Sequence, residues 1–185
     1  MYNVTRGDFL KELQRAYFSC DLHKRHLHYH DCHQLILIVK GEIRVKVGKT
    51  SFCAQGGQLL MFSRYENHSL EILSQDYERY VIHISPSADM LYSVLSNRPE
   101  GFSNIIELGV EFNSFKAFFE RLCTEFSSDK WLREDMLELL LKELMIMLRR
   151  VIPYREINCE NALIVSSIQR LFENEYQNRY TLSYL

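Results

Sequence analysis

Residues 28–47 read HYHDCHQLILIVKGEIRVKV, and the second half of this stretch decides the fold. The segment QLILIVK (34–40) is a continuous apolar run of strand length, which is typical of a buried strand. After Gly41, the segment EIRVKV (42–47) alternates apolar and charged residues, as a strand with one buried face does. Gly48 and Lys49 then form a predicted hairpin turn. The stretch therefore predicts consecutive antiparallel strands.

Further short strands are predicted after this stretch. They are TSFCA (50–54), GQLLMF (57–62), HSLEIL (68–73) and ERYVIHI (78–84). Many short strands with tight turns between them indicate a sandwich or a barrel. We therefore expect residues 1–110 to form a small antiparallel β-barrel of the jelly-roll type. A short helix from Asp8 to Tyr17, in which apolar residues recur every four positions, is expected to pack against its outside.

Polar side chains gather in the first half of the opening stretch. His28 and His30 are two residues apart, so in an extended strand they point to the same face. Gln34 can join them after an irregular step, and His68 follows the next strand pair and the turn SRYEN. Three imidazoles and one amide that converge inside a barrel would form either a metal site or a polar floor for a small ligand. The alternative is that they are core or rim residues satisfied by the protein itself.

The spacing of these residues resembles the two short motifs of the cupin superfamily. The first motif has two histidines, an acidic or amide residue four positions on, and a glycine; the second has a glycine, a loop and a histidine. This sequence carries Gln34 where the first motif usually has Glu. It also carries Ser63, Tyr65 and Ile72 where the second motif usually has Pro, Gly and Asn. A neutral amide is a poorer ligand than a carboxylate for a hard cation, so no metal is required, although a divalent metal could bind His28, His30, Gln34 and His68.

The composition excludes several classes of protein. A formal net charge of −2 over 185 residues gives no basic face for nucleic acid. No apolar run approaches the length of a membrane-spanning helix, so we expect no membrane contact. The five cysteines are odd in number and form no CxxC pair, which favours reduced thiols in the cytoplasm over a disulfide framework.

The chain changes character near residue 110, after which helical patterns dominate. Asn113 or Ser114 is a predicted N-cap for FKAFFERLCTEF, whose apolar residues form one stripe. The next helix, from Trp131 to Arg150, is apolar over more than half its circumference. A face this wide needs a second cover, which is either the neighbouring helix or a second subunit. We favour a homodimer through the helices at 114–150, packed through residues such as Leu137, Leu141 and Leu144.

The last segment, 154–185, contains a linker, an amphipathic unit and the start of a further helix after Thr181. We expect the natural protein to continue beyond residue 185. Together these features resemble the AraC family of bacterial transcription regulators. HYHDCHQLILIVKGE is similar to the family's first cupin strands, GGQLLMFSRYENHSLEI to its second motif, and ERYVIHISP to its closing strand. The resemblance implies a cupin-like domain (1–110), a helical dimerisation region (111–153) and the first part of a helix-turn-helix domain (154–185).

The function implied by the resemblance is effector sensing and dimerisation for a DNA-binding regulator, with a small metabolite, such as a sugar, in the barrel. We expect His28, His30, Gln34 and His68 to bind it. Arg64, Tyr80 and His83 stand behind them; Arg64 and Tyr80 are expected to serve the loop or the core, and the direction of His83 is left open. The alternatives are a metal-dependent cupin enzyme (dioxygenase or isomerase) that uses the same four residues, and a dimerisation module with a vestigial barrel. The missing Glu and the extra helices favour a regulator over an enzyme.

Overall fold

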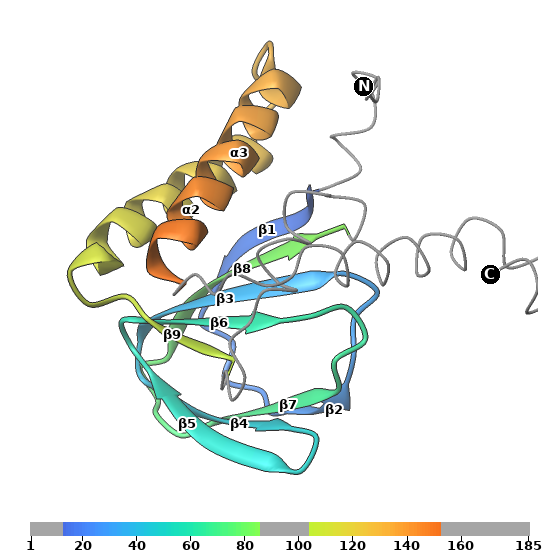
Figure 1. Ribbon diagram of the computed structural model, residues 1–185, viewed down its shortest axis with the longest axis vertical. Coiled ribbons are helices and arrows are strands. Elements are labelled where there is room, and N and C mark those ends of the chain that lie inside the picture. Colours follow the sequence, from blue (N-terminus) through green and yellow to red (C-terminus); the bar gives the residue numbers. More distant parts are fainter. Residues whose placement is uncertain (1–12, 86–103, 153–185) are drawn as a thin grey trace, which may run out of the picture.

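The protein consists of two antiparallel sheets and a pair of helices, in a computed structural model that describes residues 13–85 and 104–152 (Figure 1). The strands are β1 (Leu13–Ser19), β2 (Arg25–His28), β3 (His33–Lys40), β4 (Glu42–Val47), β5 (Thr50–Gln55), β6 (Gln58–Phe62), β7 (His68–Ile72), β8 (Glu78–Ile84) and β9 (Ile105–Glu107). A short 3₁₀ turn, η2 (Gly109–Glu111), precedes the helices α2 (Phe112–Phe126) and α3 (Arg133–Val151). One sheet has the strand order β1-β8-β3-β6-β9 and the other β2-β7-β4-β5. The predicted α+β class is confirmed.

Strand β3 carries an unbroken apolar run from Leu35 to Val39 because both of its faces are covered. Ile36 and Ile38 belong to the core between the two sheets. Leu35 and Leu37 point the other way and belong to a second core, under the helices. A strand buried on both faces shows no alternation of polarity, which is what the run QLILIVK displays. Strand β4, by contrast, buries only the face that carries Ile43, as its alternating sequence predicts.

The helices α2 and α3 cover the outer face of the five-stranded sheet, on the side away from the four-stranded sheet (Figure 1). The expected stripe on α2 is confirmed, since its buried residues are Phe115, Phe118, Phe119 and Leu122. The N-cap prediction is wrong: α2 begins at Phe112, and Asn113 and Ser114 lie inside its first turn. Helix ends are the least determined part of a sequence pattern, because capping is one of several ways to satisfy the first amides. Within the described part of the chain, no helix is long and apolar enough to cross a membrane.

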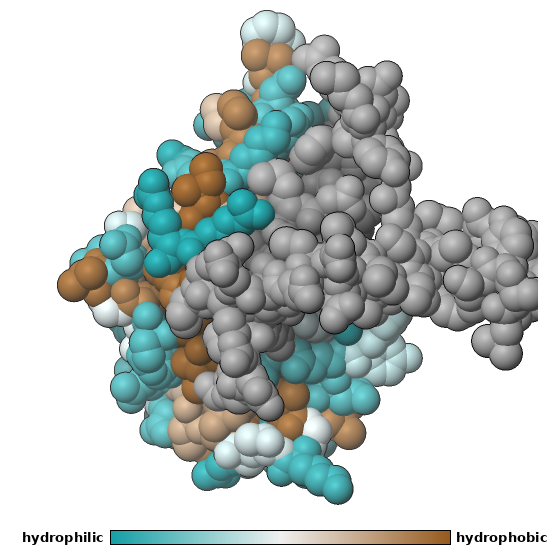
Figure 2. Space-filling model, in the orientation of Figure 1, coloured by the Kyte–Doolittle hydropathy of each residue, from teal (hydrophilic) through white to brown (hydrophobic). Residues whose placement is uncertain are grey.

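The apolar residues of α3 divide into a buried and an exposed set. Leu137, Leu141 and Leu144 are 4%, 5% and 0% exposed, because they pack into the core beneath the helices. The expectation that they contact a second subunit is therefore wrong. The large apolar side chains of α3 that remain exposed are Met136, Leu139 and Ile146. Figure 2 shows hydrophobic surface among the hydrophilic residues of this helix layer.

The helix expected from Asp8 to Tyr17 is also wrong over the residues that the structure describes. Residues 13–19 form β1, in which Tyr17 pairs with Val81 of β8. An irregularity in the pairing between Leu13 and Arg15 places Leu13 and Ala16, three residues apart, in the same core. Tyr17, four residues after Leu13, is 40% exposed, so the four-residue spacing that predicted the helix does not mark one buried face. Residues 8–12 lie outside the described part of the chain.

Two glycines shape the turns around β4. The predicted hairpin at Gly48 and Lys49 is confirmed, with Gly48 at a φ of +56°. Gly41, between β3 and β4, has a φ of +78°, and a Cβ there would lie 2.9 Å from the Cα of Tyr77 and still closer to Ser74 Oγ. Glycine is the residue that allows both this backbone conformation and this close approach.

Candidate functional site

Strand register brings the predicted polar residues to one end of the space between the sheets. His28, the last residue of β2, pairs with His68, the first residue of β7. His30 lies in the connection that leads from β2 to β3. Gln34 lies near the start of β3, on the same face as Ile36 of the inter-sheet core, and is 6% exposed. The expectation that a strand and an irregular step bring these residues together agrees with this arrangement.

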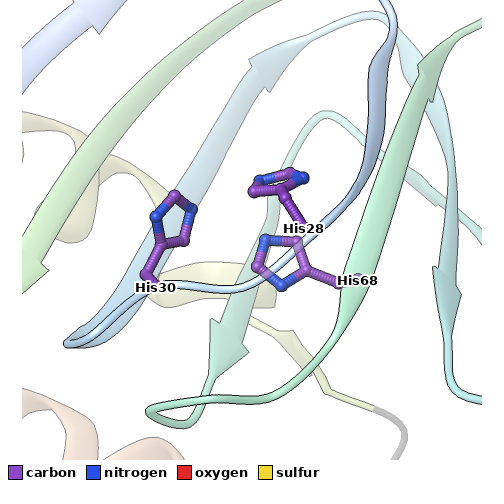
Figure 3. Close-up of side chains that lie close together, drawn as sticks. All are labelled: His28, His30 and His68. Atoms are coloured by element: carbon purple, nitrogen blue, oxygen red, sulfur yellow. The ribbon is translucent and has the colours of Figure 1, made fainter.

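The three imidazoles form a compact group, which we call the histidine cluster (His28, His30 and His68; Figure 3). The ring centroids are 4.9 Å apart for His28 and His30, 4.5 Å for His28 and His68, and 5.4 Å for His30 and His68. One ring nitrogen from each residue lies within 4.8 Å of the other two. Figure 3 shows two of the side chains rising from β2 and the loop after it, and His68 facing them from β7. Such an arrangement can hold one small ligand or ion.

Backbone carbonyls determine which nitrogen of two of these rings carries the proton. Nδ1 of His68 lies 2.8 Å from the carbonyl oxygen of Glu66, and Nδ1 of His28 lies 2.6 Å from that of His26. A carbonyl only accepts, so in both rings Nδ1–H is the donor. In the neutral ring Nε2 is then left with its lone pair. This tautomer is the one in which histidine binds a metal through Nε2.

A fourth histidine joins the cluster from β8. His83 pairs with Gln34 in the sheet, and the two side-chain nitrogens are 2.8 Å apart. Because the amide nitrogen of Gln34 can only donate, Nε2 of His83 accepts this bond. The His83 ring also lies 4.8 Å from that of His30. The sequence left the direction of His83 open because its neighbours on β8 are apolar on both faces.

Several polar atoms of the site have no hydrogen-bond partner among the described residues. They are Nε2 of His30, Nε2 of His68 and Oε1 of Gln34, all fully buried. Most buried polar atoms in proteins are satisfied, and each one that is not costs about 1–3 kcal/mol. The ring of Phe62, stacked on His68 at 4.1 Å, shields one face of the site from water. A bound ligand would satisfy these atoms.

Burial keeps the site uncharged. The pKa of His68 is lowered to about 4, mainly by desolvation and also by the neighbouring His28 and His30, against the opposing effect of the Glu66 carbonyl. The pKa of His83 is also about 4, because of burial and then of the nearby His30. Burial and His28 lower the pKa of His30 as well. Near neutral pH these rings are therefore uncharged, and each can accept a hydrogen bond or bind a metal ion through its free lone pair.

Two other candidate residues have their contacts outside the histidine cluster. Arg64 donates from Nε to the carboxylate of Asp31 at 2.6 Å, and its guanidinium lies 4.4 Å from the ring centre of Tyr65. It therefore organises the loop between β6 and β7. Tyr80 belongs to the core under the helices, with its ring 6.4 Å from that of Phe119. Both positions agree with the expected roles in loop and core.

The donor atoms of the cluster fit a transition metal ion. Uncharged imidazoles are common ligands of zinc, copper, nickel and iron. The oxygen that Gln34 offers is neutral, so the site lacks the carboxylate that suits harder ions. His28, His30 and His68 are thus the residues that would hold a metal, with Gln34 beside them. The ion would supply a Lewis acid with open coordination positions.

The comparisons with known proteins agree with the cupin-like arrangement of strands and helices. A family model described as the AraC-like ligand binding domain matches residues 12–148. The chain belongs to this family. The comparison with curated proteins gave no match.

Two solved structures of ToxT from Vibrio cholerae resemble almost the whole chain. Each covers 93% of it at 12% identity, with TM-scores of 0.53 and 0.54, and the chain spans 68% and 69% of those proteins. One of them is bound to (E)-4-(8-methylnaphthalen-1-yl)but-3-enoic acid. At this identity the likeness shows the fold alone.

Shorter matches involve cupin proteins. An RmlC-like cupin with a double-stranded β-helix fold from Methanocaldococcus jannaschii covers 38% of the chain at 14% identity, with a TM-score of 0.34, and the chain spans 66% of that protein. A variant of oxalate decarboxylase from B. subtilis covers 35% of it at 22% identity, with a TM-score of 0.32. The chain spans only 18% of the length of that enzyme.

Proposed function

We propose that this chain is the effector-sensing part of an AraC-type transcription regulator, and that the effector binds at His28, His30, Gln34 and His68. The observation that carries the proposal is the set of buried, unpartnered acceptor atoms on His30, Gln34 and His68. A ligand that offers hydrogen-bond donors, such as a hydroxyl-rich metabolite, would satisfy all of them at once. Membership of a ligand-binding domain family supports a small-molecule effector.

A metabolite screen by thermal unfolding tests this proposal. A ligand present at about 100 times its Kd stabilises the folded state by about 2.7 kcal/mol. We expect a metabolite that stabilises the unmodified chain to have no effect on Gln34→Leu and His30→Ala. Gln14→Leu is the matched control, since Gln14 is an exposed residue of β1. A metabolite that stabilises all four proteins equally would bind elsewhere and contradict the proposal.

Dimerisation is the second part of the proposal. On α3, Met136, Leu139 and Ile146 are 45%, 60% and 53% exposed and follow one another at helical spacing. Glu143, which forms an ion pair with Arg121 of α2, lies within this row and could set the register of the contact. We propose that a second copy of the chain covers this surface about a two-fold axis.

DNA binding is assigned to another part of the protein. We propose the division expected from the sequence: a cupin-like domain (1–110), a helical dimerisation region (111–153) and the beginning of a helix-turn-helix domain (154–185). The last segment lies outside the described residues. The effector would act by favouring one conformation of the dimer, which changes how two DNA-binding domains meet their half-sites.

A metal-dependent cupin enzyme is the second candidate, because three imidazoles lie close enough together to hold one metal ion. The neutral Gln34 stands against it, since such enzymes usually have a carboxylate at this motif position. Turnover of a substrate by the metal-loaded chain, lost in His30→Ala, would favour the enzyme.

A further inference from the structure

A buried positive charge lies between the two sheets, away from the histidine cluster. Arg79 is the second residue of β8, which runs between β1 and β3 in the five-stranded sheet (Figure 1). Its guanidinium lies 5.3 Å from the ring centre of Tyr77, and Val81 follows two residues later on the same face of β8. Both neighbours belong to the core between the sheets, and Arg79 itself is only 3% exposed. His83 lies four residues further on, about 13 Å along the strand.

The charge of Arg79 has no counter-ion among the residues that the structure describes. A guanidinium keeps its charge in proteins, and a buried charge is costly unless an opposite charge balances it. Arg79 forms no ion pair with a described carboxylate, and its Nε is buried without a hydrogen-bond partner. Glu78, the residue before it, is paired with Lys40 at 2.8 Å. The ring of Tyr77 offsets part of the cost by a cation–π contact, but a ring face accepts no hydrogen bond from the guanidinium edge.

Two hydroxyl groups accompany the guanidinium. Tyr77 is 1% exposed, and its hydroxyl has no hydrogen-bond partner in the described part of the chain. Burial raises the pKa of this hydroxyl against the opposing effect of Arg79, so near neutral pH it keeps its proton and can donate. Ser19, the half-buried last residue of β1, pairs with Arg79 across the sheet and therefore shares its face. Its Oγ accepts the amide of Asp21 at 3.1 Å, which leaves the hydroxyl proton able to donate.

We propose that Arg79, with the hydroxyls of Tyr77 and Ser19, forms an anion site that binds one carboxylate or phosphate group between the sheets. The inference goes beyond the proposed function, because this site lies toward the other end of β8 from the histidine cluster. The planar guanidinium offers parallel N–H groups that match two oxygens of either group, and the hydroxyls donate to the same oxygens. The histidine cluster offers acceptors, whereas the anion site offers donors and a positive charge. The two sites therefore take ligands of different charge.

Thermal unfolding in Tris chloride tests the proposal, with sodium phosphate and sodium acetate as probes and sodium chloride of matched ionic strength as the reference. At least one oxyanion should raise the midpoint of the unmodified chain, and its dependence on concentration gives the affinity. Arg79→Met should bind that oxyanion at least about tenfold more weakly, because hydrogen bonds from a charged group are lost. Arg79→Lys keeps the charge without the planar fork and should have an intermediate affinity. Arg44→Met, which removes an exposed arginine of β4, is the control and should respond as the unmodified chain does.

Nuclear magnetic resonance of the unmodified chain with ¹⁵N-labelled arginine gives a second reading that needs no variant to fold. The Nε signal of Arg79 should move when the binding oxyanion is added, while that of the exposed Arg44 stays in place. In sodium chloride alone, Arg79→Met should be at least as stable as the unmodified chain, since an apolar side chain replaces a charge without a counter-ion. Equal stabilisation of the unmodified chain and Arg79→Met by the oxyanion, or an Arg79 signal that neither phosphate nor acetate moves, overturns the anion site. Neither result involves His30 or Gln34, so the anion site and the proposed effector site can fail separately.

Discussion

Replacing single leucines of α3 by alanine tests how this helix is packed. Leu144 is 0% exposed and lies in the core between α3 and the five-stranded sheet, whereas Leu139 on the same helix is 60% exposed. Leu144→Ala leaves a cavity in a close-packed region, for which the expected loss is about 2.7–5 kcal/mol of unfolding free energy. Leu139→Ala changes exposed surface and should cost no more than about 0.5 kcal/mol. Both substitutions replace leucine by alanine within a helix, so the change in helix propensity is the same and cancels when the two variants are compared.

Urea unfolding followed by far-ultraviolet circular dichroism measures the difference. With a slope of about 2 kcal/mol per molar urea, a loss of about 3 kcal/mol lowers the midpoint by about 1.5 M. The experiment is repeated at a tenfold higher protein concentration, because a Leu139→Ala effect that depends on concentration reports association. Equal losses for the two variants at low concentration, or a loss below about 1 kcal/mol for Leu144→Ala, would refute the packing of α3 described above.

Three further outcomes are expected. Lowering the pH of the metal-free chain from 7 to 4 should destabilise the fold by about 3 kcal/mol for each of His68 and His83. Burial lowers the pKa of each ring to about 4 in the folded chain, whereas the unfolded chain keeps the ordinary value of 6.5, so acid favours the unfolded state. Urea midpoints that do not change over this range would contradict this expectation. Gly41→Ala should destabilise the fold far more than Gly48→Ala. Both glycines have a positive φ, but only at Gly41 would an added Cβ meet other atoms. Equal midpoints of thermal unfolding for the two variants would contradict that close approach. Leu139→Glu and Ile146→Glu should yield folded monomers in sedimentation, and a dimer that survives both would place the subunit contact elsewhere.

The β region could be predicted from the sequence where one strand face is polar or where a run is wholly apolar. The alternation of EIRVKV and the run QLILIVK indicate β4 and β3 directly, because burial on one or two faces leaves these patterns. The N-terminal helix was predicted from apolar residues four positions apart, a spacing that also places residues on one face of a regular strand. The bulge near Leu13 then leaves Tyr17 outside the core that holds Leu13 and Ala16. The bulge depends on how β1 pairs with β8, and the local sequence of residues 13–19 carries no information about that pairing.

The candidate site was predictable in part for a similar reason. His28, His30, Gln34 and His68 follow a motif spacing that fixes their strands and turns. The place of His83 depends on which face of β8 looks inward, and Val81 and Ile82 are both fully apolar. On α3, the sequence showed an excess of apolar residues but not which of them the sheet covers. Leu144 and Leu139 are chemically identical, and only the packing of the helix separates them.

The most direct test of the central claim, that the effector binds at the histidine cluster, is nuclear magnetic resonance of the chain with ¹⁵N-labelled histidine side chains. The metabolite found by the stabilisation screen is titrated into the metal-free and the Zn²⁺-treated chain. We expect the ring signals of His28, His30 and His68 to shift, while those of the exposed His23 and His26 stay in place. Saturable binding that leaves the three cluster signals unmoved would contradict it.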